Sequence, residues 1–429
     1  MESVKIGVCG LGTVGAGVVN LLKRNAEEIQ RKTGRRLEVV QVGCRRDNPD
    51  CDLAGIDVVR DIFAVVNNPA VEVVLEVIGG TDTALELVKQ ALANGKHVVT
   101  ANKALIAQHG DELFALAAST GVSLKFEAGI AGGIPIVKAI REGLAGNCIT
   151  RLAGIINGTS NFILTEMETA GNRSFADVLV EAQALGYAEA DPTFDVEGID
   201  AAHKLTILSS IAFGVPLRFD AIYTEGISKI TAEDIRFASE FGYRIKHLGI
   251  TTKTERGVEL RVHPTLVEKS HLLAQVNGVM NAVLVDSDAA GQTLYYGAGA
   301  GAGPTASSVV ADIIDIVRNQ GSDGIPNLGF VPAAMQALPI LGIHETESCQ
   351  YLRLSVLDRP GVLARISSIL GQHNISIESL IQKDARKAHA PIAIITDEIP
   401  EQAIIAALAE LEALDEVIGG ISRIRVESF

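Results

Sequence analysis

Two patterns of apolar residues alternate along the first 135 residues of the chain. Short runs rich in valine and isoleucine predict strands, and longer segments with apolar residues every three or four positions predict helices. The strands are expected at residues 4–10, 37–44, 71–79 and 97–102, and the helices at residues 13–30 and 83–95. Uninterrupted β-branched strands between helices are typical of a parallel sheet covered on both faces. We therefore predict a doubly wound α/β domain over residues 1–135.

The pattern changes after this domain, where helices and strands are segregated rather than alternating. Helical spacing appears at residues 174–186, 199–214 and 231–242, and strand-like alternation at residues 247–254, 257–267 and 281–298. Segregated elements indicate a separate α+β domain, which we place at residues 136–320. Within it, the glycine-rich turn GAGAGAG enters an apolar helix, and we expect residues 297–320 to return to the N-terminal domain.

The last part of the chain begins with a segment rich in proline and glycine, residues 321–349, which we interpret as a linker. From residue 350 to residue 429 the strand and helix patterns resume in the order β-α-β-β-α-β. This order is that of the ferredoxin-like fold. The sequence therefore predicts a third, small α/β domain over residues 350–429.

Composition narrows the classes of protein to consider. The net charge is −15 and basic residues form no long cluster, so a nucleic-acid partner is not expected. The five cysteines are an odd number without a C-x-x-C pair, which argues against a disulfide framework and a structural zinc site and favours a cytoplasmic location. The N-terminus enters a strand at once, so we expect no signal peptide, and no apolar run reaches the ~18 residues of a membrane span.

A glycine fingerprint directly follows the first predicted strand. Gly10, Gly12 and Gly15 form G-x-G-x-x-G at the start of a helix, which is the context that a dinucleotide-binding Rossmann domain requires. The glycines allow the backbone to approach a pyrophosphate, and the first helical turn, with Thr13 and Val14, offers unpaired N–H groups. A tight turn without a ligand is the alternative interpretation.

The choice of dinucleotide depends on the end of the second predicted strand. Arg45 and Arg46 stand there, where proteins specific for NAD commonly place a carboxylate, and arginine suits the 2′-phosphate of NADP. We therefore favour NADP as the cofactor, with NAD tolerated. The alternative is that both arginines are solvated surface residues.

Two lysines are candidates for chemistry. Lys103 follows a strand at the edge where open α/β sheets bind ligands. Lys204 follows a group of acids and enters the apolar run LTILSSIAF, where burial and nearby carboxylates can tune the charge of a lysine. The acids are Glu189, Asp191, Asp195, Glu197 and Asp200. A surface pair between Asp200 and Lys204, contributing ~0.3–0.5 kcal/mol, is the alternative.

Six motifs, in one order along residues 1–320, together resemble the homoserine dehydrogenase family. The motifs are GLGTVGAGV, VVTANKALIA, FEAGIAGGIPI, GIINGTSNFIL, GYAEADPTFDVEGIDAAHKL and GAGAGAGPTASSVVADI. The segment YLRLSVLDRPGVLARISSILGQHNISIESLIQ resembles an ACT domain, a regulatory module that commonly binds amino acids. The whole resembles the monofunctional bacterial type, in which residues 136–320 would form the substrate-binding and dimerisation domain.

The resemblance implies an enzyme that interconverts L-aspartate 4-semialdehyde and L-homoserine with NAD(P). Lys204 would be the general acid and Lys103 would help to orient the substrate, while Glu189 and Asp200 would hold the substrate's amino group. The pocket would further be lined by Asp195, Tyr187, Gly158 and Thr159. The cofactor would also contact Thr100, Lys103, Gly186 and Gly303.

The same resemblance implies ligands beyond the reaction. A sodium ion would be held, mostly through carbonyl oxygens, by Glu127, Ile130, Gly132 and Ile134. Threonine would inhibit through the ACT domain, and the chain would form a homodimer or homotetramer. Two alternatives remain: an aspartate-semialdehyde dehydrogenase that uses Cys148 as its nucleophile, and an amino-acid-binding regulatory protein with an inactive Rossmann domain.

Overall fold

The computed structural model describes residues 3–169, 173–319, 328–330, 335–383 and 389–429. The chain divides into two compact units, each built from separated stretches of sequence. The first unit comprises residues 1–152, 201–220 and 281–338, and the second comprises residues 153–200, 221–280 and 339–429. This division follows contacts rather than chain order, so the linear domain boundaries given above stay predictions.

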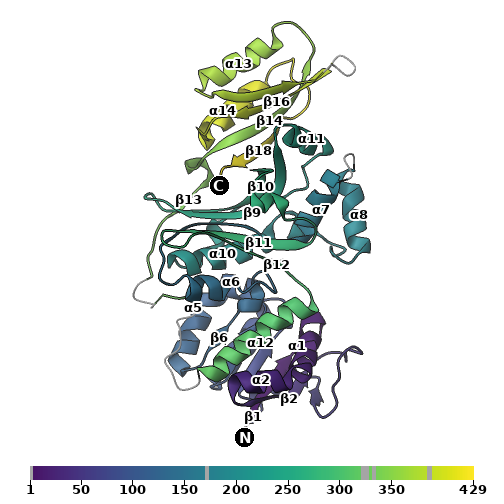
Figure 1. Cartoon of the computed structure of the whole chain (residues 1–429), viewed down its shortest axis with the longest axis vertical. Helices are drawn as coiled ribbons and strands as arrows, with labels where there is room; N and C mark the ends of the chain where they lie inside the picture. The colour runs from purple at the N-terminus through teal and green to yellow at the C-terminus, as the bar shows by residue number, and fades with distance from the viewer. Residues whose placement is uncertain (1–2, 170–172, 320–327, 331–334, 384–388) are drawn as a thin grey trace. The chain divides into compact units, whose positions relative to one another are not determined.

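The first unit contains a parallel sheet of six strands among the described residues, in the order β3-β2-β1-β4-β5-β6. Figure 1 labels β1, β2 and β6 of this sheet. The strands are β1 (Ser3–Cys9), β2 (Arg36–Gly43), β3 (Asp57–Val59), β4 (Val73–Glu76), β5 (His97–Thr100) and β6 (Leu124–Lys125). Every neighbouring pair runs parallel. Val73, Val74 and Leu75 are completely buried, as expected of strands covered on both faces. The predicted doubly wound parallel sheet is confirmed.

Helices connect and cover these strands. They are α1 (Thr13–Arg24), α2 (Ala26–Thr33), α3 (Ile62–Asn67), α4 (Asp82–Ala93) and α5 (Lys103–Thr120). A later helix, α12 (Ala302–Arg318), packs on α1 so closely that a Cβ atom added to Gly17 would lie 2.7 Å from the carbonyl oxygen of Ala302. The single helix predicted over residues 13–30 is wrong. It is interrupted at Asn25, which leaves helical geometry and separates α1 from α2.

The first unit also contains the strands β11 (Met280–Ser287) and β12 (Gly291–Ala298), apart from the terminal Met280, and the first half of β7 (Ile149–Ile155). Its buried loop after β6 passes through the short helix α6 (Ile136–Lys138). The helix α10 (Ile199–Phe213) crosses from one unit to the other, since the division falls between Asp200 and Ala201.

The second unit is organised on a mixed sheet in which β9, β10, β18, β14, β16 and β15 are consecutive neighbours (Figure 1). The antiparallel strands β9 (Tyr243–Lys253) and β10 (Val258–Glu268) form its long hairpin. Short strands at its margins are β8 (Tyr223–Thr224), β13 (Ile340–Leu341) and β17 (Ile399–Pro400). The helices before the hairpin are α7 (Gly158–Thr169), α8 (Phe175–Ala184), α9 (Thr193–Val196) and α11 (Ala232–Glu240).

The C-terminal module has the predicted β-α-β-β-α-β order, which is confirmed. Its elements are β14 (Glu347–Leu357), α13 (Val362–Gln372), β15 (Ile377–Gln382), β16 (His389–Thr396), α14 (Glu401–Glu412) and β18 (Ser422–Glu427). The sequence did not indicate that β18 pairs in parallel with β10, with Arg425 opposite Thr265. This pairing joins the module's sheet to the hairpin within the second unit.

Part of the expected linker, residues 321–349, lies outside the described residues, because residues 320–327 and 331–334 are not described. After this part, β13 pairs in parallel with the start of β10. Among the described residues, no helix is both long enough and apolar enough to cross a membrane.

Candidate active site

The glycine-rich loop between β1 and α1 has a different constraint at each glycine. Gly10 has φ of +105°, and a Cβ atom there would lie 2.6 Å from the carbonyl oxygen of Val77. A Cβ atom on Gly15 would lie 2.1 Å from the carbonyl oxygen of Gly10, so this glycine allows α1 to pack against the loop. A Cβ atom on Gly12 would meet no described atom within 4 Å. The protein thus requires Gly10 and Gly15 for its own packing, whereas the space beside Gly12 is open to a ligand.

The start of α1 is suited to an anion. Gly12 is the N-cap and supplies no side-chain acceptor to the first turn, where Thr13 and Val14 lie. The exposed N–H groups of such a turn bind phosphate oxygens well. The start of α12 is similar, because Gly301 caps it without a side-chain acceptor and Gly303 has open space beside it.

The loop after β2 presents Arg45 and Arg46 as exposed side chains, as the sequence indicated. Sequence reasoning missed Arg60, which holds this loop: its guanidinium lies 2.9 Å from the carboxylate of Asp47 and donates to the carbonyl oxygen of Cys44. Asn48 donates to the carbonyl oxygen of Leu11 and so ties the loop to the glycine-rich turn. No local pattern marks Arg60, because it becomes relevant only when β3 lies beside β2.

The carboxyl ends of β4 and β5 carry a buried hydrogen-bonded pair. The hydroxyl of Thr100 donates to the carboxylate of Glu76 at 2.5 Å, and the backbone N–H of Asn102 donates to Thr100. Burial raises the pKa of Glu76, against the lowering effect of the hydrogen bonds that its carboxylate accepts, that from Thr100 first among them. Asn102 caps α5, so Lys103 is the first residue of that helix and is half-buried at this edge of the sheet. The structure therefore places Thr100 and Lys103 at the same strand end.

In the second unit, one amide joins two of the predicted acids. The Nδ2 atom of Asn157 donates to Asp195 at 2.8 Å and to Asp200 at 2.9 Å, while its Oδ1 atom accepts from the backbone N–H of Ser160. Asp200 is buried and Asp195 is half-buried. Sequence reasoning missed Asn157, although it lies in the quoted motif GIINGTSNFIL. Its bridging role depends on α9 and α10 returning to the end of β7, which no local pattern reveals.

The remaining second-unit candidates lie around the start of α7. Thr159 is buried and its hydroxyl donates to the carbonyl oxygen of Tyr187 at 2.6 Å, so Gly158, Thr159 and Tyr187 belong to one neighbourhood. The ring of Tyr187 is itself exposed and contacts Phe162 edge-on. Glu189 is exposed and is not joined to the Asp195–Asp200 cluster by any hydrogen bond between described residues.

Lys204 lies on α10, one turn after Asp200, and only 8% of it is exposed. Residues on every side of this helix are buried, among them Ala201, Leu205 and Ile207. The predicted position of Lys204 at the edge of the core is confirmed, and a solvated helix-surface pair is not the right description. Burying a charged lysine costs free energy unless the ammonium group is paired and hydrogen-bonded.

The loop from β6 to α6 is buried and rich in oxygen acceptors. The carboxylate of Glu127 accepts backbone N–H groups from Val137 and Lys138 at 2.9 and 3.0 Å. Burial and the nearby Asp312 raise the pKa of Glu127 to about 7. Ala131 and Gly132 have consecutive φ values of 52° and 48°, which turn the backbone sharply between Ile130 and Ile134. Among the described residues, no three His, Cys, Asp or Glu side chains are grouped as metal ligands, so any ion here would depend on carbonyl oxygens.

The parallel sheet with its glycine-rich loop and the appended ferredoxin-like module define the class: a dinucleotide-binding protein with a small C-terminal domain. Three family models match the chain: homoserine dehydrogenase over residues 135–314, the NAD-binding domain of homoserine dehydrogenase over residues 10–127, and the ACT domain over residues 350–416. The chain belongs to the homoserine dehydrogenase family and is an oxidoreductase.

Individual relatives agree with this assignment over the whole chain. The homoserine dehydrogenase of Pseudomonas aeruginosa is 60% identical and covers 100% of this chain and 99% of its own length. A solved homoserine dehydrogenase from Thiobacillus denitrificans is 54% identical, with a TM-score of 0.94 and coverage of 100% and 99%. A hyperthermophilic archaeal homoserine dehydrogenase, solved in complex with NADPH, is 28% identical, with a TM-score of 0.62 and coverage of 73% of this chain and 98% of that one.

Exchanging single glycines of the loop for alanine will separate cofactor binding from folding. We expect Gly12→Ala to leave the melting temperature unchanged, because the added methyl group meets no described atom, and to weaken dinucleotide binding by about tenfold or more. Gly15→Ala, the matched control, will lower the melting temperature because its methyl group would clash with Gly10. Fluorescence titration and thermal unfolding measure both. If Gly12→Ala binds the dinucleotide as well as the wild type, a cofactor does not approach there.

Proposed function

We propose that the chain catalyses the reversible NAD(P)H-dependent reduction of L-aspartate 4-semialdehyde to L-homoserine, in the biosynthesis of threonine, methionine and isoleucine. One observation in particular supports this reaction: Lys204 is buried one turn beyond Asp200, on a helix that is buried along most of its length. Reduction of an aldehyde requires a hydride donor, a proton donor and an anchor for the substrate. The dinucleotide, when bound, supplies the hydride.

The side chains would divide the remaining tasks. Lys204 donates the proton to the aldehyde oxygen, because proton transfer from a positioned side chain in the transition state accelerates such a reduction. Lys103, at the strand end, orients the same oxygen. Asp200 and Glu189 hold the substrate's ammonium group, and Asn157 fixes the carboxylate of Asp200 by donating to it.

The family assigns further contacts. Asp195, Tyr187, Gly158 and Thr159 would line the substrate pocket. Gly10, Gly12, Thr13, Val14, Gly15, Thr100, Gly186 and Gly303 would contact the dinucleotide. For Gly186 and Gly303, the support is that added Cβ atoms would meet no described atom within 4 Å.

Two other functions are less well supported. A semialdehyde dehydrogenase of the thioester type needs an activated cysteine, whereas Cys148 is exposed and has no side-chain hydrogen bond among the described residues. A regulatory protein with an inactive nucleotide domain has no need to bury Lys204. A spectrophotometric assay with NADPH and L-aspartate 4-semialdehyde tests the proposal, since a purified protein that leaves NADPH unoxidised would exclude it.

Replacing the proposed general acid should abolish turnover selectively. We expect Lys204→Met to lower kcat by about 10²–10⁴-fold, the usual contribution of a positioned acid, while NADPH affinity stays within about twofold. Steady-state kinetics and NADPH titration measure the two quantities. Lys89→Met is a control, because Lys89 forms a solvent-exposed pair with Glu112. Equal losses of NADPH affinity and kcat in Lys204→Met would mean that the lysine is structural.

We further propose that NADP is preferred over NAD. The exposed Arg45 and Arg46 lie on a loop that Arg60 and Asn48 hold beside the glycine-rich turn, where the adenosine ribose of a dinucleotide is expected. The archaeal relative solved with NADPH is consistent with this preference.

Removing the arginines tests the preference. We expect the double substitution Arg45→Ala and Arg46→Ala to lower kcat/KM for NADPH by about tenfold to a hundredfold, the loss expected for charge-assisted hydrogen bonds, and to leave kcat/KM for NADH within about twofold. Arg31→Ala serves as the control, because Arg31 is solvent-exposed on α2. An equal effect on both cofactors would show that these arginines do not recognise the 2′-phosphate.

A sodium ion is proposed in the loop that contains Glu127, Ile130, Gly132 and Ile134. The ligands are all oxygens, which suit a hard cation. The hydroxyl of Ser308 already donates to the carbonyl oxygen of Gly132, but a carbonyl oxygen has a second lone pair. A cation would offset the buried negative charge of Glu127 and brace the loop against α12.

Sodium should therefore stabilise the fold. At equal ionic strength and a sodium concentration ten times its Kd, the free energy of unfolding should exceed that in choline chloride by about 1.4 kcal/mol. Thermal unfolding in the two salts measures this difference. Glu127→Gln should reduce the difference, and Glu28→Gln, on the exposed face of α2, should leave it unchanged. The same melting temperature in both salts would argue against a sodium site.

The proposal also covers how the enzyme is regulated, how it assembles and where it is located. Threonine is expected to inhibit the enzyme through the C-terminal module, which matches the ACT domain model. A homodimer or homotetramer and a cytoplasmic location are also expected. Inhibition by threonine in the NADPH assay and sedimentation of the full chain test the first two, and a monomer unaffected by threonine would contradict both.

A further inference from the structure

Glu76 is a completely buried acid at the carboxyl end of β4, and the proposed reaction gives it no task. It lies at the edge of the parallel sheet where open α/β domains bind their ligands. Burying an ionised carboxylate costs free energy unless hydrogen bonds or an opposite charge stabilise it. The groups around this carboxylate therefore indicate what it does for the protein.

Four hydrogen-bond donors converge on the carboxylate of Glu76. The hydroxyl of Thr100 donates to it at 2.5 Å, and the backbone N–H of Ile78 donates to it at 2.9 Å. The backbone N–H of Gly79 and the side-chain amide of Asn102 donate to it as well. These donors belong to two separate segments, the turn after β4 and the connection from β5 to α5. One carboxylate thus holds two segments of the sheet edge together.

The turn after β4, residues 77–80, has the shape of a surface that a ligand approaches closely. Gly79 and Gly80 are exposed and have φ values of 71° and 72°, and Cβ atoms added to them would meet no described atom within 4 Å. The same turn contacts the glycine-rich loop, because a Cβ atom on Gly10 would lie 2.6 Å from the carbonyl oxygen of Val77. The turn is therefore part of the edge that a dinucleotide would contact.

The connection from β5 to α5 is tied to the same cluster. The Nδ2 atom of Asn102 also donates to the carbonyl oxygen of Gly80 at 2.6 Å, and its Oδ1 atom accepts from the backbone N–H of Leu105 as the cap of α5. This helix begins with Lys103, which orients the substrate in the proposed reaction. The position of Lys103 thus depends on the hydrogen bonds that meet at Glu76.

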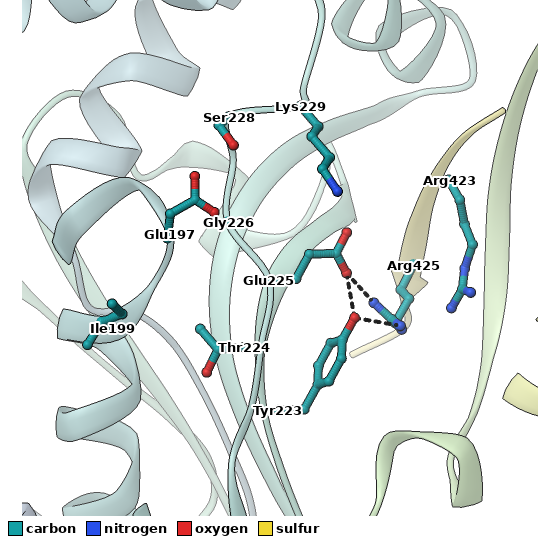
Figure 2. Close-up of a pocket in the computed structure, with 10 residues that line it drawn as sticks. All are labelled: Glu197, Ile199, Tyr223, Thr224, Glu225, Gly226, Ser228, Lys229, Arg423 and Arg425. Atoms are coloured by element: carbon teal, nitrogen blue, oxygen red, sulfur yellow. Dashed lines mark hydrogen bonds and ion pairs between the residues drawn. The ribbon is translucent and has the colours of Figure 1, made fainter. Parts of the chain in front are cut away.

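The carboxylate of Glu76 differs from others in the chain because it has no cationic partner. Glu225, for example, lies 2.9 Å from Arg425 (Figure 2). Among the described residues, no lysine, arginine or histidine forms an ion pair with Glu76. Burial raises the pKa of Glu76, and the four donors offset this effect only in part. The thiol of Cys9, on β1, stays uncharged beside it, because burial and Glu76 both raise the pKa of that thiol.

We propose that Glu76 is a positioning residue of the dinucleotide site, whose ionised carboxylate holds the turn after β4 in the shape that binds the cofactor. A protonated carboxyl group carries a donor of its own and accepts hydrogen bonds less strongly than a carboxylate. Protonation therefore loosens the turn, and dinucleotide binding weakens in mildly acidic solution. This inference rests on the proposed use of a dinucleotide and deepens it, since it makes the affinity for the cofactor depend on pH.

Calorimetric titration of the full chain with NAD, from about pH 8 to about pH 5, tests this dependence. NAD is preferable to NADP here, because a phosphate monoester itself titrates near about pH 6. We expect the Kd for NAD to rise at least about threefold as the pH falls, because the dinucleotide binds the form with ionised Glu76. A Kd that stays constant over this range would overturn the proposal.

Substitutions then assign the pH dependence to Glu76. Glu76→Gln should raise the Kd about tenfold at about pH 8 and abolish its further rise, because the side chain no longer titrates. Glu76→Asp keeps the charge and should restore part of the affinity together with the pH dependence. Glu72→Gln is the matched control, because Glu72 precedes the other end of the same strand, where it accepts from the backbone N–H of Lys5. Wild-type pH dependence in Glu76→Gln would refute the role of Glu76.

Thr100→Val provides a second test, which decides the question if Glu76→Gln does not fold. This variant keeps the charge of Glu76 but removes the donor that lowers its pKa most, so the rise in Kd should occur at higher pH than in the wild type. An unchanged or lower midpoint would contradict the proposal. A wild type that binds NAD with the expected pH dependence, but leaves NADPH unoxidised with the semialdehyde, would reject the proposed reaction alone.

Discussion

The second unit depends on how the edge of β10 is occupied. One edge of this strand pairs along its full length with β9, while the other is shared by three short strands in sequence: β13, β8 and β18. An unpaired edge of this length would be prone to association with other chains. Because the last strand of the C-terminal module completes this edge, the module belongs to the sheet of the unit instead of hanging from a linker. A truncation before residue 350 would uncover the part of β10 that β18 protects.

Ion pairs, each with one buried member, fix the module in this arrangement. Arg353 of β14 pairs with Asp234 of α11 at 2.7 Å, and Arg425 of β18 pairs with Glu225 after β8. Such pairs contribute little net stability compared with apolar packing, but removal of one partner commonly costs about 3–5 kcal/mol, because the other charge is left buried. These ion pairs therefore mainly select one position of the C-terminal module within the second unit.

Local periodicity was sufficient to predict the parallel sheet and the ferredoxin-like order, because each depends on the pattern within single segments. It was also sufficient for Lys204, whose apolar neighbours in sequence correctly indicated burial. It failed at Asn25, where a single capping residue divides a helix without changing the apolar pattern. Asn157, Arg60 and the pairing of β18 with β10 were missed for another reason. Each of these contacts joins residues that are far apart in sequence. No pattern within a single segment can therefore predict them.

The course of α10 explains why the proposed reaction depends on packing. The helix begins at Ile199, continues through Asp200, whose carboxylate Asn157 holds in place, and carries Lys204 into the core. A packed helix transmits a displacement at its first turn along its axis, because its buried side chains leave few other ways to relax.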